Sequence, residues 1–271
     1  MHQNGYIEVH GGPIYYEVAG DGTPFVMIHA GVADSRQWNH EFTAFADSYR
    51  VVRYDQRGFG KSVPHDSEYS LYGDFVALVE TLQVARPFVL MGGSMGGGTA
   101  LDYALDHPQD VKALILVGSG PSGLALDVPS SEKFVEVEAA FNEGDLDRVC
   151  ELEMQIWFDG PGRTAADVDQ QMRALAYEMN RLALELEVRG IGRRLPSPTA
   201  PAAGRLASLQ APLLVIVGEH DQPYMHGAAN VMAAEVPKVR VAPIADAGHL
   251  PNMDQPAEFQ RIVRAFLNDV A

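Results

Sequence analysis

The stretch Phe88-Val89-Leu90-Met91-Gly92-Gly93-Ser94-Met95-Gly96-Gly97-Gly98-Thr99-Ala100-Leu101 decides the fold of this chain. It begins as an apolar run typical of a buried strand, and it ends with a helical spacing. Between the two lies Gly92-x-Ser94-x-Gly96. A strand that turns directly into a helix crowds the backbone, so that only small residues fit two positions before and after the corner. We therefore predict a nucleophile elbow with an exposed Ser94 hydroxyl; the alternative is a glycine-rich turn with an incidental serine.

The composition is that of a globular chain that can bury a full core. Its 271 residues suffice for one large domain or for a domain with an insertion. The net charge of −16 argues against nucleic acid or an anionic membrane as a partner. Cys150 is the only cysteine, which excludes an intrachain disulfide and a cysteine-based metal cluster.

We expect a soluble, cytoplasmic protein without a membrane partner. The first residues, Met1 to Val9, lack the basic and apolar segments of a signal peptide. No apolar run approaches the ~20 residues that are needed to span a bilayer. No feature of the sequence requires an oligomer, so a monomer and a homodimer both stay open.

Strand and helix patterns alternate along most of the chain, which favours a mostly parallel sheet covered by helices on both faces, the α/β class. From about residue 122 to 201, amphipathic helical stripes replace the strand patterns. We predict an α/β core of residues 1–121 and 202–271, with residues 122–201 as a helical cap (a lid) over the strand ends, where open α/β sheets bind ligands. The expected strands are 6–10, 14–18, 25–28, 49–54, 88–91, 111–117, 213–217 and 239–244.

A serine hydroxyl becomes a good nucleophile only when a base removes its proton, so a histidine and an orienting acid are required. His249 lies directly after the last expected strand, in a loop of glycine and proline. His29 ends an earlier strand beside small residues, and we interpret it as a brace for that loop. Asp221 follows the strand before the last, and a triad acid normally comes from a separate strand end. Asp246 and Asp254, which are near His249 in sequence, are the alternatives.

The order Ser94, Asp221, His249 is that of the α/β-hydrolases. The chain resembles the α/β-hydrolase-fold serine hydrolases over essentially its whole length outside the predicted cap. It is most similar to the small capped carboxylesterases and 3-oxoadipate enol-lactonase-like enzymes. The motifs that carry the resemblance are His29-Ala30-Gly31, Asp55-x-Arg57-Gly58-x-Gly60-x-Ser62, Gly92-Gly93-Ser94-Met95-Gly96-Gly97, Gly218-Glu219-His220-Asp221 and the run from Gly248 to Pro256. The first of these departs from the His-Gly-x that the family often has.

The resemblance implies a two-step hydrolysis of small, mostly apolar carboxylic esters or lactones that needs no cofactor and no metal. Ser94 would attack the carbonyl, His249 would take its proton and Asp221 would hold the imidazole. The N–H groups of Gly31 and Met95 would form the oxyanion hole, with Ala30 as the alternative to Gly31. Serine rather than aspartate at position 94 argues against the dehalogenase and epoxide-hydrolase branches of the fold.

Three aromatic residues are candidates to line the substrate pocket, although core packing explains each equally well: Trp38, Trp157 and Phe158. Asp55 and Arg57 are interpreted as parts of a structural turn. Two other functions stay open. One is a perhydrolase or a C–C bond-cleaving enzyme, although the family's C–C hydrolases usually have more glycine and proline than Ala30-Gly31-Val32. The other is a ligand sensor that keeps the triad but turns over slowly and signals through its cap.

Overall fold

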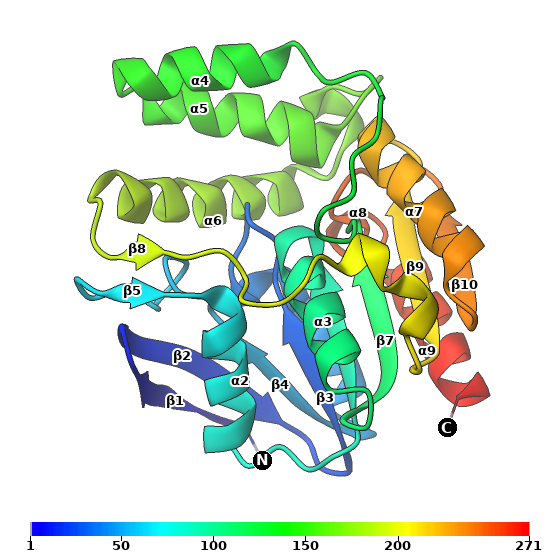
Figure 1. The fold of residues 1–271 in the computed structure, drawn as a ribbon. Coiled ribbons are helices and arrows are strands. Elements are labelled where there is room, and N and C mark those ends of the chain that lie inside the picture. Colours follow the sequence, from blue (N-terminus) through cyan, green and yellow to red (C-terminus); the bar gives the residue numbers. More distant parts are fainter. Residues whose placement is uncertain (1, 271) are drawn as a thin grey trace.

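A computed structural model describes residues 2–270 of the chain. Its centre is an eight-stranded sheet in the order β1-β2-β4-β3-β6-β7-β9-β10 (Figure 1). β2 pairs antiparallel with β1 and β4, whereas the other neighbouring strands are parallel. This is the α/β fold class predicted from the sequence, and each expected strand is present. The strands are β1 (His2–Val9), β2 (Gly12–Ala19), β3 (Thr23–Ile28), β4 (Tyr49–Tyr54), β6 (Phe88–Gly93), β7 (Val111–Val117), β9 (Leu213–Gly218) and β10 (Val239–Ile244).

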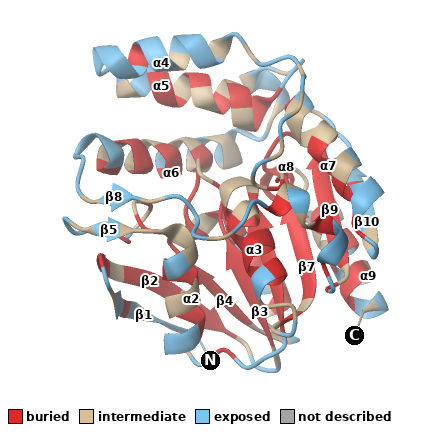
Figure 2. Cartoon of the chain, viewed as in Figure 1, coloured by how far each residue is buried: buried red, intermediate tan, exposed pale blue. Residues whose placement is uncertain are grey.

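Helices cover both faces of this sheet. They are α1 (Asn39–Phe45), α2 (Leu71–Thr81), α3 (Ser94–Asp106), α7 (Pro223–Glu235) and α9 (Pro256–Asp269), with the short turns η1 (Ser35–Trp38), η4 (Ala202–Gly204), η5 (Leu206–Ser208) and α8 (Pro251–Asp254). In β3, Val26 and Ile28 pack under α2, α3 and α7, whereas Phe25 and Met27 pack under α1 and α9. A strand that is buried on both faces needs apolar side chains at every position, which explains the continuous apolar runs. Figure 2 shows this buried centre of the sheet.

Between β7 and β9 the chain leaves the sheet and forms helices that lie above the ends of its strands (Figure 1). These inserted helices are α4 (Lys133–Glu143), α5 (Leu146–Glu153), the π-helical turn η2 (Met154–Asp159), η3 (Ala165–Asp167) and α6 (Gln170–Val188). Phe158 and Met179 pack with Ala30 and Leu250 from the loops at the sheet edge. The limits of a separate cap, residues 122 and 201, stay a prediction. Within residues 2–270, no helix has the length and apolar composition that crossing a membrane requires.

A second sheet has only two short strands, and no sequence pattern indicates it. β5 (Glu68–Tyr69) pairs in parallel with β8 (Arg193–Arg194). β8 lies inside residues 122–201, where only helices are expected. Two residues are too few to show the period of a strand, so this pairing cannot be recognised from the sequence. It ties the chain after α6 to the loop before α2.

A buried carboxyl group links α1 to the C-terminal helices. Glu41 is fully buried, and its carboxylate oxygens accept hydrogen bonds from Asn252 Nδ2 at 3.1 Å and Gln260 Nε2 at 3.4 Å. Burial raises the pKa of Glu41 to about 7. The folded protein therefore keeps a proton on Glu41 that the unfolded chain releases near pH 4.5.

We predict that this group lowers the free energy of unfolding as the pH rises from about 4.5 to about 7, because ionisation of Glu41 is disfavoured only in the folded state. Glu41→Gln keeps the shape of the side chain and cannot ionise. Between about pH 5 and about pH 8, the free energy of unfolding should decrease less in Glu41→Gln than in the wild type. The difference between the two decreases should be on the order of 3 kcal/mol. Urea unfolding measures this, with the exposed Glu143→Gln as the control. The same pH dependence in Glu41→Gln and in the wild type would contradict the assignment.

Candidate active site

The turn from β6 into α3 holds Ser94 in a strained backbone conformation. β6 ends at Gly93 and α3 begins at Ser94, whose φ angle is +47°. A Cβ atom on Gly92 would lie 2.5 Å from the carbonyl oxygen of Gly96, and one on Gly96 would lie 2.4 Å from that of His29. Only glycine fits at these two positions, as the motif predicts. A non-glycine residue with positive φ is held there by its surroundings, and such strain gathers at functional sites.

Asp221 and His249 form a buried hydrogen-bonded pair. Asp221 follows β9, and His249 lies between β10 and α8. His249 Nδ1 lies 2.8 Å from Asp221 Oδ1, which also accepts the Gln222 N–H at 2.7 Å. Both side chains are almost inaccessible to solvent. A carboxylate only accepts hydrogen bonds, so the proton stays on Nδ1 and the lone pair of Nε2 is available as a base.

The two alternative acids make other contacts. Asp254 Oδ2 accepts hydrogen bonds from a backbone N–H and from Arg163. Asp246 is exposed and has a φ angle of +53°. The structure thus pairs His249 with Asp221, the acid that the sequence favours, because β9 and β10 are neighbours whose ends lie side by side.

Ser94 and His249 lie at the same edge of the sheet, because β6, β7, β9 and β10 are consecutive parallel neighbours. Gly118, at the end of β7, leaves room for the imidazole: a Cβ atom there would lie 2.9 Å from His249 Nδ1. Among the hydrogen bonds of residues 2–270, none joins the Ser94 hydroxyl to His249. Catalytic hydrogen bonds often tighten only when substrate binds.

The loop after β3 lies against the first turn of α3. Gly31 is next to Met95, since a Cβ atom on Gly31 would lie 3.7 Å from Met95 Cβ. The N–H of Ala30, the alternative oxyanion donor, already donates to Gln37 Oε1 at 2.8 Å. This bond favours Gly31, together with Met95, as the pair of donors.

His29 stabilises the same loop through hydrogen bonds, as the sequence predicts. Its Nδ1–H donates to the carbonyl oxygen of Ala30 at 2.7 Å, and its Nε2 accepts the Gln56 N–H at 2.9 Å. Burial lowers the pKa of His29, which favours the neutral imidazole that can make both bonds. His29 therefore has a structural role here.

A cavity of about 460 Å³ opens beside Gly31 and Met95. Its lining includes Glu153 and Asn180 from the inserted helices and Arg194 from β8. Burial raises the pKa of Glu153, whose carboxylate accepts a hydrogen bond from Asn180 Nδ2 at 2.7 Å. The serine and the histidine described above do not line this cavity. Its walls are more polar than the mostly apolar substrates suggested by the sequence would require.

Of the three aromatic residues predicted for the pocket, Trp157 reaches the Asp–His pair. Its ring centroid lies 4.6 Å from that of His249, and its carbonyl oxygen accepts the His249 N–H at 3.1 Å. Trp38 is fully buried in the core near Phe259, and Phe158, in η2, is fully buried between the inserted segment and the loops at the sheet edge. Trp38 and Phe158 have no surface open to a substrate in this structure, so the core-packing interpretation applies to both.

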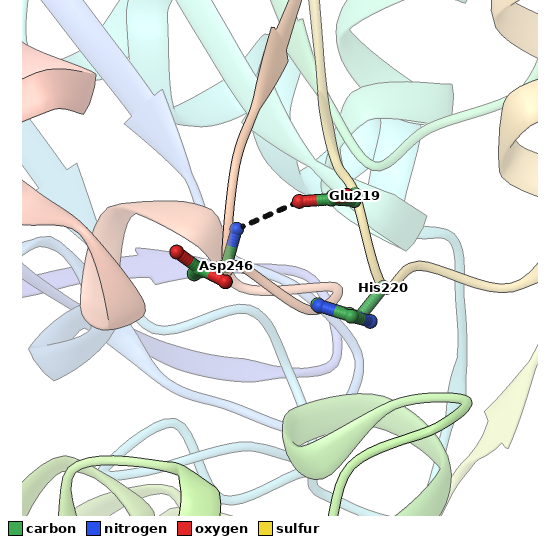
Figure 3. Close-up of side chains that lie close together, drawn as sticks. All are labelled: Glu219, His220 and Asp246. Atoms are coloured by element: carbon green, nitrogen blue, oxygen red, sulfur yellow. Dashed lines mark hydrogen bonds between the residues drawn. The ribbon is translucent and has the colours of Figure 1, made fainter.

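A cluster of Glu219, His220 and Asp246 joins the loops that carry Asp221 and His249 (Figure 3). Glu219 Oε2 accepts the Asp246 N–H at 3.1 Å. Each residue of the cluster offers one ligand atom, and these atoms lie within 4.8 Å of one another, so the cluster could hold a metal ion. The hydrogen bond between the two loops is enough to explain the arrangement, and we assign no metal.

A family model for the α/β-hydrolase fold matches residues 23–256. The chain belongs to the α/β-hydrolase fold family. A relative, the 2-hydroxy-6-oxo-6-phenylhexa-2,4-dienoate hydrolase of Comamonas testosteroni, is 26% identical over 94% of this chain and 91% of its own. Another, the pimeloyl-(acyl-carrier protein) methyl ester esterase of Aeromonas hydrophila subsp. hydrophila, is 29% identical over 92% of this chain and 96% of its own.

Solved structures of the family superpose over nearly the whole chain. Est816, described as an N-acyl homoserine lactone degrading enzyme, has a TM-score of 0.76 and 27% identity over 97% of this chain and 100% of its own. The enol-lactonase of Burkholderia xenovorans LB400 has a TM-score of 0.78 and 22% identity over the same shares, a likeness that concerns the fold alone. The chain is therefore a hydrolase of the α/β family with esterases and lactonases among its neighbours.

Two substitutions of Ser94 separate the backbone strain from the hydroxyl group. Glycine adopts a φ angle of +47° without the steric cost that other residues bear. Ser94→Gly should therefore be more stable than Ser94→Ala by roughly 0.5–1 kcal/mol, after the greater chain entropy of unfolded glycine is subtracted. Thermal unfolding of the two variants measures the difference. Equal or greater stability of Ser94→Ala would show that the corner is not strained.

Proposed function

We propose that this chain hydrolyses carboxylic esters or lactones of small molecules, with Ser94 as the nucleophile, His249 as the base and Asp221 as the residue that orients the base. The observation that carries the proposal is the buried Asp221–His249 hydrogen bond, at the sheet edge where the strained Ser94 also lies. A serine at a helix N-terminus, with an imidazole held by a buried carboxylate, is what nucleophilic catalysis by serine requires.

In the first step, His249 Nε2 takes the proton of Ser94 as its oxygen attacks the carbonyl carbon. Asp221 holds the imidazole in the correct tautomer and stabilises the imidazolium that forms. The N–H groups of Gly31 and Met95 donate to the oxyanion, and the dipole of α3 adds to their effect. The alcohol leaves with the proton from His249. Water, deprotonated by His249, then cleaves the acyl-enzyme, and the cycle needs no cofactor or metal.

The relatives and the cavity support this substrate class. One relative is a methyl ester esterase, and one structural neighbour is described as an N-acyl homoserine lactone degrading enzyme. The cavity beside Gly31 and Met95 includes Arg194 and Glu153 in its lining, so it suits a substrate that carries a polar group beyond the scissile bond. The partner we propose is thus a small molecule rather than a nucleic acid or a membrane.

Cleavage of a carbon–carbon bond is the second candidate. The C. testosteroni relative is named as a 2-hydroxy-6-oxo-6-phenylhexa-2,4-dienoate hydrolase. Two others, at 25% and 27% identity, are named as 2-hydroxy-6-oxononadienedioate/2-hydroxy-6-oxononatrienedioate hydrolases. The same serine and histidine could act on such a substrate. The loop Ala30-Gly31-Val32 has less glycine and proline than the C–C hydrolases usually have, which places this reaction second.

Turnover of p-nitrophenyl esters of increasing acyl length, and of simple lactones, tests the proposal. We expect multiple turnovers that fall by at least about 10⁴-fold in Ser94→Ala, which removes the nucleophile. Asp221→Asn should lower kcat by about 10⁴-fold, because it leaves the imidazole in the wrong tautomer. Circular dichroism of each variant confirms that it is folded.

Each of the other outcomes identifies an alternative. Full activity in Ser94→Ala would contradict the role of Ser94. A burst of product followed by almost no turnover would indicate the slow ligand sensor. Cleavage of a 2-hydroxy-6-oxo dienoate without any ester or lactone turnover would favour the C–C hydrolase.

A further inference from the structure

Arg163 links the inserted segment to the loop between β10 and α8. Its side chain is nearly buried and donates hydrogen bonds to four acceptors. Two acceptors belong to the inserted segment, the carbonyl oxygens of Phe158 at 2.9 Å and Asp159 at 2.6 Å. The other two lie after β10: the carbonyl oxygen of Asp246 at 2.8 Å and, at the end of α8, Asp254 Oδ2 at 2.9 Å. One guanidinium thus joins segments that are far apart in the sequence.

Asp254 connects this contact to the backbone beside His249. Its Oδ2, which is bound to Arg163, also accepts the Gly248 N–H at 2.7 Å. A Cβ atom on Gly248 would lie 2.4 Å from the carbonyl oxygen of Phe158 and 2.8 Å from Arg163 Nη2, so this backbone lies tightly against the inserted segment. Because Gly248 directly precedes His249, a shift of Arg163 or Asp254 would move the imidazole.

The π-helical turn η2 makes further contacts to His249 and to Gln222, the neighbour of Asp221. The carbonyl oxygen of Trp157 accepts the His249 N–H at 3.1 Å. The carbonyl oxygen of Ile156 accepts a hydrogen bond from Gln222 Nε2 at 2.7 Å, next to Asp221. A π-helical turn departs from regular helical bonding and is frequent at functional sites. Consecutive carbonyl groups of η2 therefore bind the backbone of His249 and the side chain of the residue that follows Asp221.

We propose that Arg163 and Asp254 are a positioning pair that sets the orientation of His249 toward Ser94, so that the inserted segment governs the catalytic step as well as covering the cavity. The pair touches no reacting atom and acts through the Gly248 backbone. The proposal rests on the catalytic roles proposed for Ser94 and His249. Burial raises the pKa of Asp254 and Arg163 opposes this effect, so loss of the guanidinium would leave a buried carboxylate without its counter-charge.

Arg163→Gln and Asp254→Asn test the pair, with Arg173→Gln as the matched control. Arg173 also forms a buried ion pair, with Asp159 Oδ1 at 2.8 Å, but its hydrogen bonds stay inside the inserted segment. We expect each test variant to lower kcat by about 10–100-fold and to change KM by less than about twofold, because a misplacement of about 1 Å can cost about 10²-fold in rate. The control should change kcat by less than about twofold.

The double variant Arg163→Gln/Asp254→Asn tests whether the two residues act through one contact. The effects of substitutions within one network are not additive. The kcat of the double variant should therefore be no lower than that of the less active single variant. Losses that multiply would overturn the idea of a pair. An equal loss of kcat in Arg173→Gln would overturn it as well, since it would show a general effect of buried ion pairs.

A second readout does not depend on an ester substrate. The Nδ1 proton of His249, which is hydrogen-bonded to Asp221, should give a low-field resonance in the proton NMR spectrum. This resonance should shift or broaden in Arg163→Gln and Asp254→Asn and stay in place in Arg173→Gln. An unchanged resonance in both test variants would overturn the positioning role. A wild type that turns over neither esters nor lactones would contradict the proposed function, while the resonance would still decide whether the pair positions His249.

Discussion

Crowding of the backbone where β6 turns into α3 fixes the geometry on which the rest of the site depends. Gly96 lies so close to the carbonyl of His29 that no side chain fits between them, which presses the loop after β3 against the start of the helix. Gly31 is thereby held beside Met95, and Ser94 is held in a conformation that favours glycine. Main-chain contacts set these positions, so Ser94 and the loop that carries Gly31 are placed before any substrate arrives.

Charged and polar side chains then orient the other part of the site, the loop that carries His249. The Asp221–His249 hydrogen bond and the Arg163–Asp254 ion pair are both buried, and a buried ion pair adds little net stability because desolvation offsets its attraction. These contacts matter for orientation, since each holds one side chain in a fixed position relative to a neighbouring loop. The inserted segment supplies Arg163 and the carbonyl groups of η2 to the surroundings of His249, and other residues of the same segment, among them Glu153 and Asn180, line the cavity.

Local patterns in the sequence predict most of the fold and the chemical centre of the candidate site. Strands such as β3 and β9 are continuous apolar runs because both faces of the sheet are covered. Ser94, Asp221 and His249 can be chosen because each lies at or shortly after the end of a strand and has the side chain that serine catalysis needs. The structure places Asp221 and His249 in hydrogen-bond contact, whereas the catalytic roles of the three residues and the link from His249 to Ser94 stay predictions.

The remaining features depend on contacts between distant segments, which local patterns do not reveal. Arg163 carries no motif, and its carboxylate partner is 91 residues away. The sequence could not show whether Trp38 and Phe158 line a pocket or pack in the core, because apolar residues in both places have the same sequence pattern. Glu153 and Arg194 come together only in the folded chain, so the polar lining of the cavity could not be foreseen.

The central claim is that His249, held by Asp221, activates Ser94. Intact-protein mass spectrometry after reaction with a fluorophosphonate tests it most directly, because this reagent traps an activated serine covalently. We predict one adduct per chain, on the peptide that carries Ser94, formed far more slowly in His249→Gln than in the wild type. An adduct on a different residue, or equally fast labelling of Ser94 in His249→Gln, would contradict the claim.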